Sequence, residues 1–187
     1  MTASAAIGAY SDEVNEALAS DDAFDAWYLR TAPRVHAYLM RRCGQDDSLA
    51  DELLQETVIA AIDRRSRFEP GSDVVAWLCG IARHKLADHY RRLERDERRW
   101  IQLEVREIQV DRPVTTETGL DERTAISEAI QSLPAAQRAV LIFAILDDRP
   151  ISEVARLMHR SPLAIQSLLH RARQGFKRAY RGEALDD

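Results

Sequence analysis

The stretch ISEVARLMHRSPLAIQSLLHRAR, residues 151–173, decides the architecture of the second half of this chain. Its first ten residues have helical apolar spacing, a tight link follows, and a longer helix is predicted to begin at Ser161. Serine favours the N-cap of a helix, and Pro162 favours its first position. Two helices joined by a short link have the layout of a helix-turn-helix, in which the second helix enters the major groove of DNA.

The second of these helices has one apolar face and one basic face. The apolar residues recur at intervals of four and three: Ile165, Leu169, Ala172, Phe176 and Ala179. On another face Gln166, His170, Arg173 and Lys177 repeat. Residues 161–180 contain arginine and lysine but no carboxylate, although the chain has a net charge of -5. Because each base gains by displacing counterions from DNA, this face is predicted to meet phosphates; a solvated basic face is the alternative.

Helical periodicity also organises the rest of the chain. We predict a first domain over residues 23–100, a flexible linker over 101–122 that is rich in Pro, Gly, Thr and acids, and a second domain over 123–182. Residues 1–22 form an acidic N-terminal extension. The expected helices of the first domain cover 24–44, where Pro33 is a candidate kink, 46–68 and 74–100, and those of the second cover 125–133, 136–146, 151–160 and 161–180. With no strand-like alternation, the predicted fold is all-α, with two small helical domains and a helix-turn-helix in the second.

Composition excludes several classes of protein. The chain has 187 residues, of which 45% are hydrophobic, and this is enough for packed cores. It has no run of about 18 apolar residues and no basic start followed by an apolar block, so we expect a cytoplasmic protein without membrane insertion. Cys43 and Cys79 stand alone, without a CxxC pattern or a nearby histidine. Neither a disulfide nor a zinc site is predicted, and no cofactor is expected.

The predicted first domain carries two further motifs. ADELLQETVIAAID, residues 50–63, places polar side chains beside an apolar stripe, and such a cluster is suited to dock on a basic surface. By itself this motif is weak, because acidic residues near helix starts are common for dipole reasons. A loop then leads to AWLCGIARHKLADHYRR, residues 76–92, which combines aromatic and basic residues on one helix.

These motifs, in this order, resemble the sigma-70 family of bacterial transcription initiation factors, of the short extracytoplasmic-function type. The resemblance covers about residues 24–181. DELLQET resembles the polymerase-docking helix of the family, residues 76–92 its promoter-opening and minus-ten segment, and LPAAQRAVLIFAI together with residues 151–173 its minus-thirty-five domain. The implied partners are core RNA polymerase, promoter DNA and an anti-sigma factor.

The resemblance also implies roles for individual residues. Those implied to bind RNA polymerase are Asp51, Glu52, Gln55 and Glu56. The loop from Phe68 to Asp73 is implied to receive an unstacked base, and the residues implied to lie near the separated strand are Arg83, His84, Lys85, Asp88, Arg91 and Arg92. Cationic grooves with aromatic platforms hold single strands in this way. Trp77 is a candidate platform, although its helical spacing favours a place in the core.

On the minus-thirty-five side, the predicted DNA-binding residues are Ser161, Leu163, Ala164, Gln166, Ser167, His170, Arg171, Arg173 and Lys177. His159 stands where the family usually has glycine, and Gln166 and Leu168 stand where many members have bases. Fewer phosphate contacts are therefore expected. The apolar trio of Leu163, Ala164 and Leu168 is suited either to touch thymine methyl groups or to dock on a partner protein, and the residues alone leave this open.

Two other functions compete with this interpretation. A stand-alone helix-turn-helix regulator accounts for the second domain but leaves DELLQET and the basic helix unexplained. A metal-dependent enzyme using His84, Asp88 and His89 requires three converging ligands, and His89 points away from Asp88 around the helix. We therefore predict a protein that performs no covalent chemistry of its own.

Overall fold

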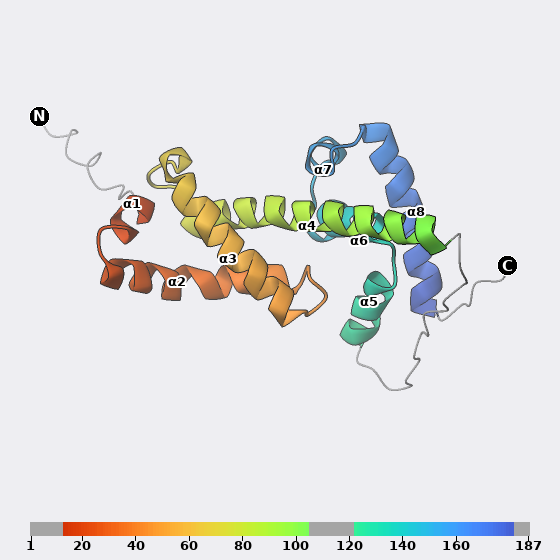
Figure 1. Cartoon of the computed structure of the whole chain (residues 1–187), viewed down its shortest axis with the longest axis horizontal. Coiled ribbons are helices and arrows are strands. Elements are labelled where there is room, and N and C mark those ends of the chain that lie inside the picture. Colours follow the sequence, from red (N-terminus) through yellow and green to blue (C-terminus); the bar gives the residue numbers. More distant parts are fainter. Residues whose placement is uncertain (1–12, 105–121, 182–187) are drawn as a thin grey trace, which may run out of the picture. The chain divides into compact units, whose positions relative to one another are not determined.

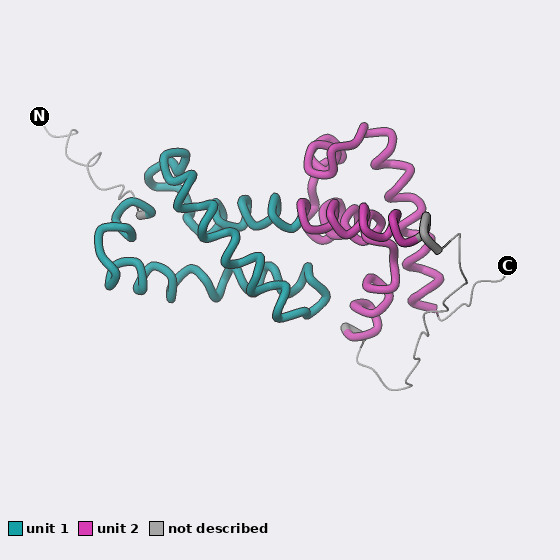
Figure 2. The backbone as a smooth tube through the Cα atoms, viewed as in Figure 1, with its two compact units in different colours: residues 1–86 teal, residues 87–187 magenta. Residues whose placement is uncertain are grey.

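The computed structural model describes residues 13–104 and 122–181, and within these ranges the chain forms helices and no strand (Figure 1). This confirms the all-α prediction. The chain divides into two compact units, Met1–Leu86 and Ala87–Asp187 (Figure 2). The expected linker, residues 101–122, lies mostly outside the described residues. No helix of the described chain is both long and apolar enough to cross a bilayer.

The first unit is built from helices that begin at polar caps. Its elements are α1 (Glu13–Ala17), α2 (Asp21–Met40), α3 (Asp47–Asp63), a short 3-10 turn (Arg65–Arg67) and the first part of α4 (Val74–Glu104). Ser20 Oγ accepts a hydrogen bond from the Ala23 amide, and Asp46 Oδ1 accepts one from the Leu49 amide at 3.0 Å. These side chains satisfy amides that have no partner within the helix.

The first helix of the structure, α1, falls within the expected N-terminal extension, residues 1–22. Val14 and Ala17 of α1 are buried, and α1 packs on α2, so the described residues from 13 onward belong to the first unit. Residues 1–12 of the expected extension lie outside the described residues. Helix α2 is assigned as one continuous helix through Pro33.

The core of the first unit is apolar, with two buried threonines. Trp27, Leu39 and Leu53 are among the buried residues. The hydroxyls of Thr31 and Thr57 donate to backbone carbonyls four residues earlier, at 2.9 and 2.6 Å, which offsets the cost of their burial. Cys43 and Cys79 do not form a disulfide. Burial, reinforced by Asp46, raises the pKa of the Cys43 thiol to about 12, so this thiol stays protonated near neutral pH.

The second unit contains the distal part of α4 and the four C-terminal helices that the sequence predicts. These helices are α5 (Glu122–Gln131), α6 (Ala135–Leu141), α7 (Ile151–Leu157) and α8 (Pro162–Arg181), and α6 continues into a π-helical turn at Ile142–Leu146. Helices α5, α6 and α7 all pack against α8. A Cβ at Gly175 would lie 2.8 Å from Leu133 Cδ2, so α8 passes close to the α5–α6 junction at a residue without a side chain.

The boundary between the units falls inside α4, between Leu86 and Ala87. The predicted first domain, residues 23–100, contains this helix to residue 100. In the structure the distal half of α4 is held within the second unit by polar contacts, which are described below. The sequence does not indicate this boundary, because the backbone hydrogen bonds of the helix continue across it and no helix-breaking residue is needed there.

Candidate functional site

The helix-turn-helix has the backbone that its link sequence predicts. His159 adopts a left-handed conformation with φ of 51°, which confirms that it occupies a position that favours glycine. The amide of Arg160 donates to the Ala155 carbonyl at 2.9 Å and closes the end of α7. Ser161 Oγ accepts a hydrogen bond from the Ala164 amide at 3.2 Å, so Ser161 is the N-cap of α8 as predicted.

Helix α8 presents most of the predicted DNA-binding residues to solvent. The exposed ones are Ser161, Leu163, Gln166, Ser167, His170, Arg171, Arg173 and Lys177, and Ala164 is half-buried. Leu168 corrects the expected apolar trio, because only 5% of it is exposed and it packs in the core with Ile165 and Leu169. Leu163, by contrast, is 76% exposed. An apolar contact from this helix therefore depends on Leu163, with Ala164 beside it.

A shallow hollow of about 610 Å³ lies where α7 turns into α8. Three basic side chains line it, Arg156, His159 and Arg160, together with the cap residue Ser161. Arg156 and Arg160 are not among the residues predicted to bind DNA, because they precede the basic face of α8. Their positions in the first helix and the link of the helix-turn-helix could have marked them as candidate DNA-binding residues. The positive surface of the motif thus includes both of its helices.

On α3, the four residues predicted to bind polymerase differ in exposure. Asp51, Glu52 and Gln55 are exposed, whereas Glu56 is half-buried. Ile59 is 62% exposed, and the helical repeat of about 3.6 residues places it on the same face as Glu52 and Gln55. We call Glu52, Gln55 and Ile59 the α3 face. Sequence reasoning missed Ile59, although its spacing from Leu53 and Val58 sets it outside the buried stripe.

Two ion pairs in the first unit involve these acids. Glu56 Oε2 lies 3.2 Å from Lys85 Nζ, and each side chain is about 30% exposed or less. This contact joins a residue expected to face polymerase with one expected to face DNA. Asp51 Oδ1 lies 3.2 Å from His36 Nε2, a pair that is ionic when the histidine is protonated. Glu52 and Gln55 are therefore the better probes of an intermolecular contact.

The loop between α3 and α4 is anchored by an aromatic pair. Phe68 is only 5% exposed, and its ring packs edge-to-face on Trp77 at a centroid distance of 5.3 Å. The ring of Phe68 is therefore unavailable to a base in this conformation, and the core interpretation of Trp77 is favoured. The residues that follow it, 69–73, are exposed. The role of this loop in DNA binding stays a prediction.

The basic residues predicted along α4 fall on both sides of the unit boundary. In the first unit His84 is exposed, while Arg83 and Lys85 are half-buried. In the second, Asp88 pairs with Arg91, and Arg92 is exposed. Among the described residues no three His, Cys, Asp or Glu side chains are grouped as a metal site requires.

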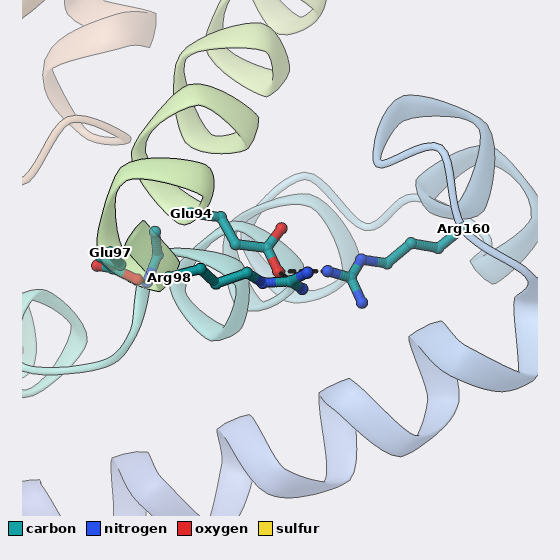
Figure 3. A network of polar contacts seen from close by, with 5 residues as sticks. Glu94, Glu97, Arg98 and Arg160 are labelled. Atoms are coloured by element: carbon teal, nitrogen blue, oxygen red, sulfur yellow. Dashed lines mark hydrogen bonds and ion pairs between the residues drawn. The ribbon is translucent and has the colours of Figure 1, made fainter. Parts of the chain in front are cut away.

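The distal part of α4 contacts the helix-turn-helix through polar side chains. Glu94 pairs with Arg160 of the link and also with Arg98, one turn further along α4 (Figure 3). Arg91 donates to the Leu157 carbonyl at the end of α7. The Glu97 carboxylate accepts from the Ala135 amide at 3.0 Å. These contacts bring residues about 40 to 65 positions apart in the sequence into one cluster.

Comparison with known proteins assigns the family. A family model described as Sigma-70 region 2 matches residues 27–96, and one described as Sigma-70, region 4 matches residues 123–174. The ECF RNA polymerase sigma factor SigF of Caulobacter vibrioides is 32% identical over 141 residues, which cover 74% of this chain and 75% of SigF. The chain belongs to the ECF sigma-70 family. This sigma factor therefore acts in transcription initiation, as its resemblance predicted.

Other similar proteins agree with this assignment. The RNA polymerase sigma factor CarQ of Myxococcus xanthus is 28% identical over 152 residues, which cover 81% of this chain and 86% of CarQ. The sigma factor RpoE from Bartonella quintana, solved in complex with the anti-sigma factor NepR, has a TM-score of 0.51 at 21% identity. That comparison covers 88% of this sigma factor and 99% of RpoE, and it supports the fold. The region 2 match ends at residue 96, within the part of α4 that packs in the second unit.

Proposed function

We propose that this sigma factor divides promoter-specific initiation among three surfaces. The α3 face binds core RNA polymerase, the basic part of α4 with the preceding loop meets the opened minus-ten element, and α8 reads the minus-thirty-five element. The corresponding domains are residues 23–100 and 123–182, joined by 101–122. The exposed α3 face carries the proposal, because a DNA-binding helix-turn-helix alone has no need of it.

The chemistry of the α3 face suits a basic partner surface. Glu52 and Gln55 offer carboxylate and amide groups, and Ile59 adds an exposed apolar side chain beside them. Interfaces commonly combine a central apolar anchor with polar groups that set orientation and partner choice. Glu56 is already paired with Lys85, so its contribution is to support α3 against α4 as well as to add negative charge.

A charge reversal at Glu52 tests the docking surface. Glu52→Arg should weaken binding to core RNA polymerase by about tenfold or more, because it opposes a basic surface with a like charge. The measurement is the dissociation constant of the labelled full-length factor with core enzyme. Asp25→Arg is the matched control, since it reverses an exposed acid on α2 outside the α3 face. Equal affinities for the two variants, with unchanged helicity, would remove α3 as the docking element.

The two DNA surfaces are supported by charge and exposure. On α4 the proposed residues are Arg83, His84, Lys85, Asp88, Arg91 and Arg92, and cationic side chains suit a separated strand. On α8 the exposed bases suit duplex phosphates, and Gln166 is suited to a base edge. The protein contributes binding alone and performs no covalent step, so RNA synthesis is the work of the polymerase. We place its action in the cytoplasm, where that enzyme works.

The family also predicts an anti-sigma factor as a partner of this protein. Co-purification of the full-length factor from its own cells, followed by competition with core polymerase, tests this prediction. A protein that binds the factor and is displaced by core enzyme would have the expected behaviour.

A further inference from the structure

The distal part of α4 exposes a tryptophan beside three arginines. Trp100 is 65% exposed, and Arg92, Arg95 and Arg99 are exposed on the same stretch of helix. A tryptophan ring is ordinarily buried in large part, because removing so much apolar surface from water is favourable. A ring left in solvent among cations therefore points to a ligand that covers it.

Helical geometry gathers these side chains on one side of α4. Each residue advances about 100° around an α-helix, so the three arginines fall within about 60° of one another and Trp100 lies about 80° from Arg92. The contacts that hold α4 to the helix-turn-helix domain use the opposite side of the helix. The arginines and the tryptophan thus project from a helix that is fixed along its other side.

Two of these residues lie outside both family regions. The region 2 match ends at residue 96 and the region 4 match begins at residue 123, so Arg99 and Trp100 fall between them. The surface therefore extends beyond what this chain shares with the two family models. Its role has to be inferred from its own chemistry.

Arginine and tryptophan side by side suit a single strand of nucleic acid. Guanidinium groups pair with phosphates, and an exposed indole ring offers a face on which an unpaired base stacks. A duplex does not cover the ring in this way, because its bases are already stacked on one another. Asp96 is an exposed carboxylate on the same side of α4, and it opposes a phosphate without outweighing three arginines.

We propose that Arg92, Arg95, Arg99 and Trp100 form a binding site for single-stranded DNA at the end of α4, with the arginines on phosphates and one unpaired base on the ring of Trp100. DNA is favoured because Arg92 is also among the residues proposed to meet the opened minus-ten element, so a strand that passes Arg92 continues along the same side of the helix. The site adds a fourth surface to the three proposed above. Its use at a promoter rests on that proposed function, whereas strand binding itself does not require polymerase.

The first test separates stacking from charge in the full-length factor. The probe is a fluorescently labelled oligodeoxyuridylate of about 20 nucleotides, which exceeds the length of one such site, titrated over a series of salt concentrations. Trp100→Ala should weaken binding by about fivefold or more and leave the salt slope unchanged. Arg95→Ala and Arg99→Ala should weaken binding and each reduce the slope by about 0.7. Arg34→Ala, at an exposed base on α2, is the control for net charge.

The carboxylate on this side of α4 gives an expected change of opposite sign. Asp96→Asn should bind the same strand about two times more tightly than the unsubstituted factor, because it removes a charge that repels phosphate. Asp25→Asn, at an exposed acid on α2, is its matched control and should bind as the unsubstituted factor does. Equal tightening by both variants would reflect net charge alone and would count against the site.

The second test identifies the kind of strand. Trp100→Ala should leave binding to a duplex of the probe with its complement unchanged, and an oligouridylate of the same length should bind no more tightly than the deoxy strand. Tighter binding of the RNA, equal affinities of Trp100→Ala and Arg34→Ala for the deoxy strand, or no measurable binding of that strand by the unsubstituted factor overturns the proposal. Because core polymerase is absent, failure of the α3 docking test leaves these results unaffected, and the two hypotheses fail separately.

Discussion

At the scale of single residues, His159 occupies a left-handed backbone position that glycine would adopt with less strain. Its φ of 51° lies in the left-handed region, where a β-carbon is strained and glycine is not. Its side chain lines the basic hollow of the motif. Histidine at this position therefore combines a strained backbone with a polar group on the proposed DNA-binding surface.

His159→Gly should stabilise the protein by about 0.5–1 kcal/mol, because relief of the left-handed strain exceeds the added entropy of the unfolded chain. Urea denaturation monitored by circular dichroism measures this change. His170→Gly is the control, since His170 is exposed within α8 and glycine in a helix interior costs about 1 kcal/mol. Destabilisation by both substitutions would show that the link does not hold this conformation in solution.

Ser161 and Phe68 differ in how far the sequence around them predicts their structure. The cap at Ser161 was predictable, because it depends on side chains within three residues of one another. The burial of Phe68 was not, because a residue in a turn between helices has no periodicity to mark it. Its packing on Trp77 depends on the angle at which α4 leaves the loop, and that angle is set by the tertiary structure.

At the scale of elements, the buried face of α8 is wider than the apolar stripe predicted from its sequence. The predicted stripe contains one apolar residue in each helical turn and does not include Leu168. Three helices, α5, α6 and α7, pack against α8, and its proximal half contains the buried residues Ile165, Leu168, Leu169 and Ala172. Its distal half is less covered, and Phe176 and Ala179, expected inward, are only half-buried. The number of packing partners thus decides how broad the buried face is.

The exposed bases of α8 should contribute affinity without sequence preference. Arg173→Ala and Lys177→Ala should each weaken duplex binding about equally across sequences and reduce the salt slope by about one unit. The measurement is the dissociation constant of the full-length factor over a series of salt concentrations. Arg34→Ala is the control, because Arg34 is an exposed base on α2, outside the proposed DNA-binding surfaces. A slope unchanged by all three substitutions would exclude this face from DNA contact.

At the scale of the whole molecule, the structural units and the family regions divide α4 differently. The region 2 match extends to residue 96, whereas the compact units separate after Leu86. Residues 87–96 of α4 therefore fall within the region 2 match, but they pack in the C-terminal unit.

This division predicts the stability of C-terminal fragments. A fragment of residues 87–187 should be more stable than one of residues 105–187 by at least about 1 kcal/mol, since the shorter one lacks the Glu97 cap on α6 and the Glu94 pair. Urea unfolding of the two fragments measures the difference. A stability that does not depend on residues 87–104 would confine the C-terminal domain to α5–α8.

The sequence by itself determined the helices, the caps, the helix-turn-helix link and the family, because these depend on neighbours a few residues apart or on motifs in fixed order. Only the tertiary structure decided that Leu168 is buried and that Glu94 meets Arg160. Contacts of this second kind join residues far apart in the chain. Their geometry depends on how whole helices pack, and local periodicity does not predict this packing.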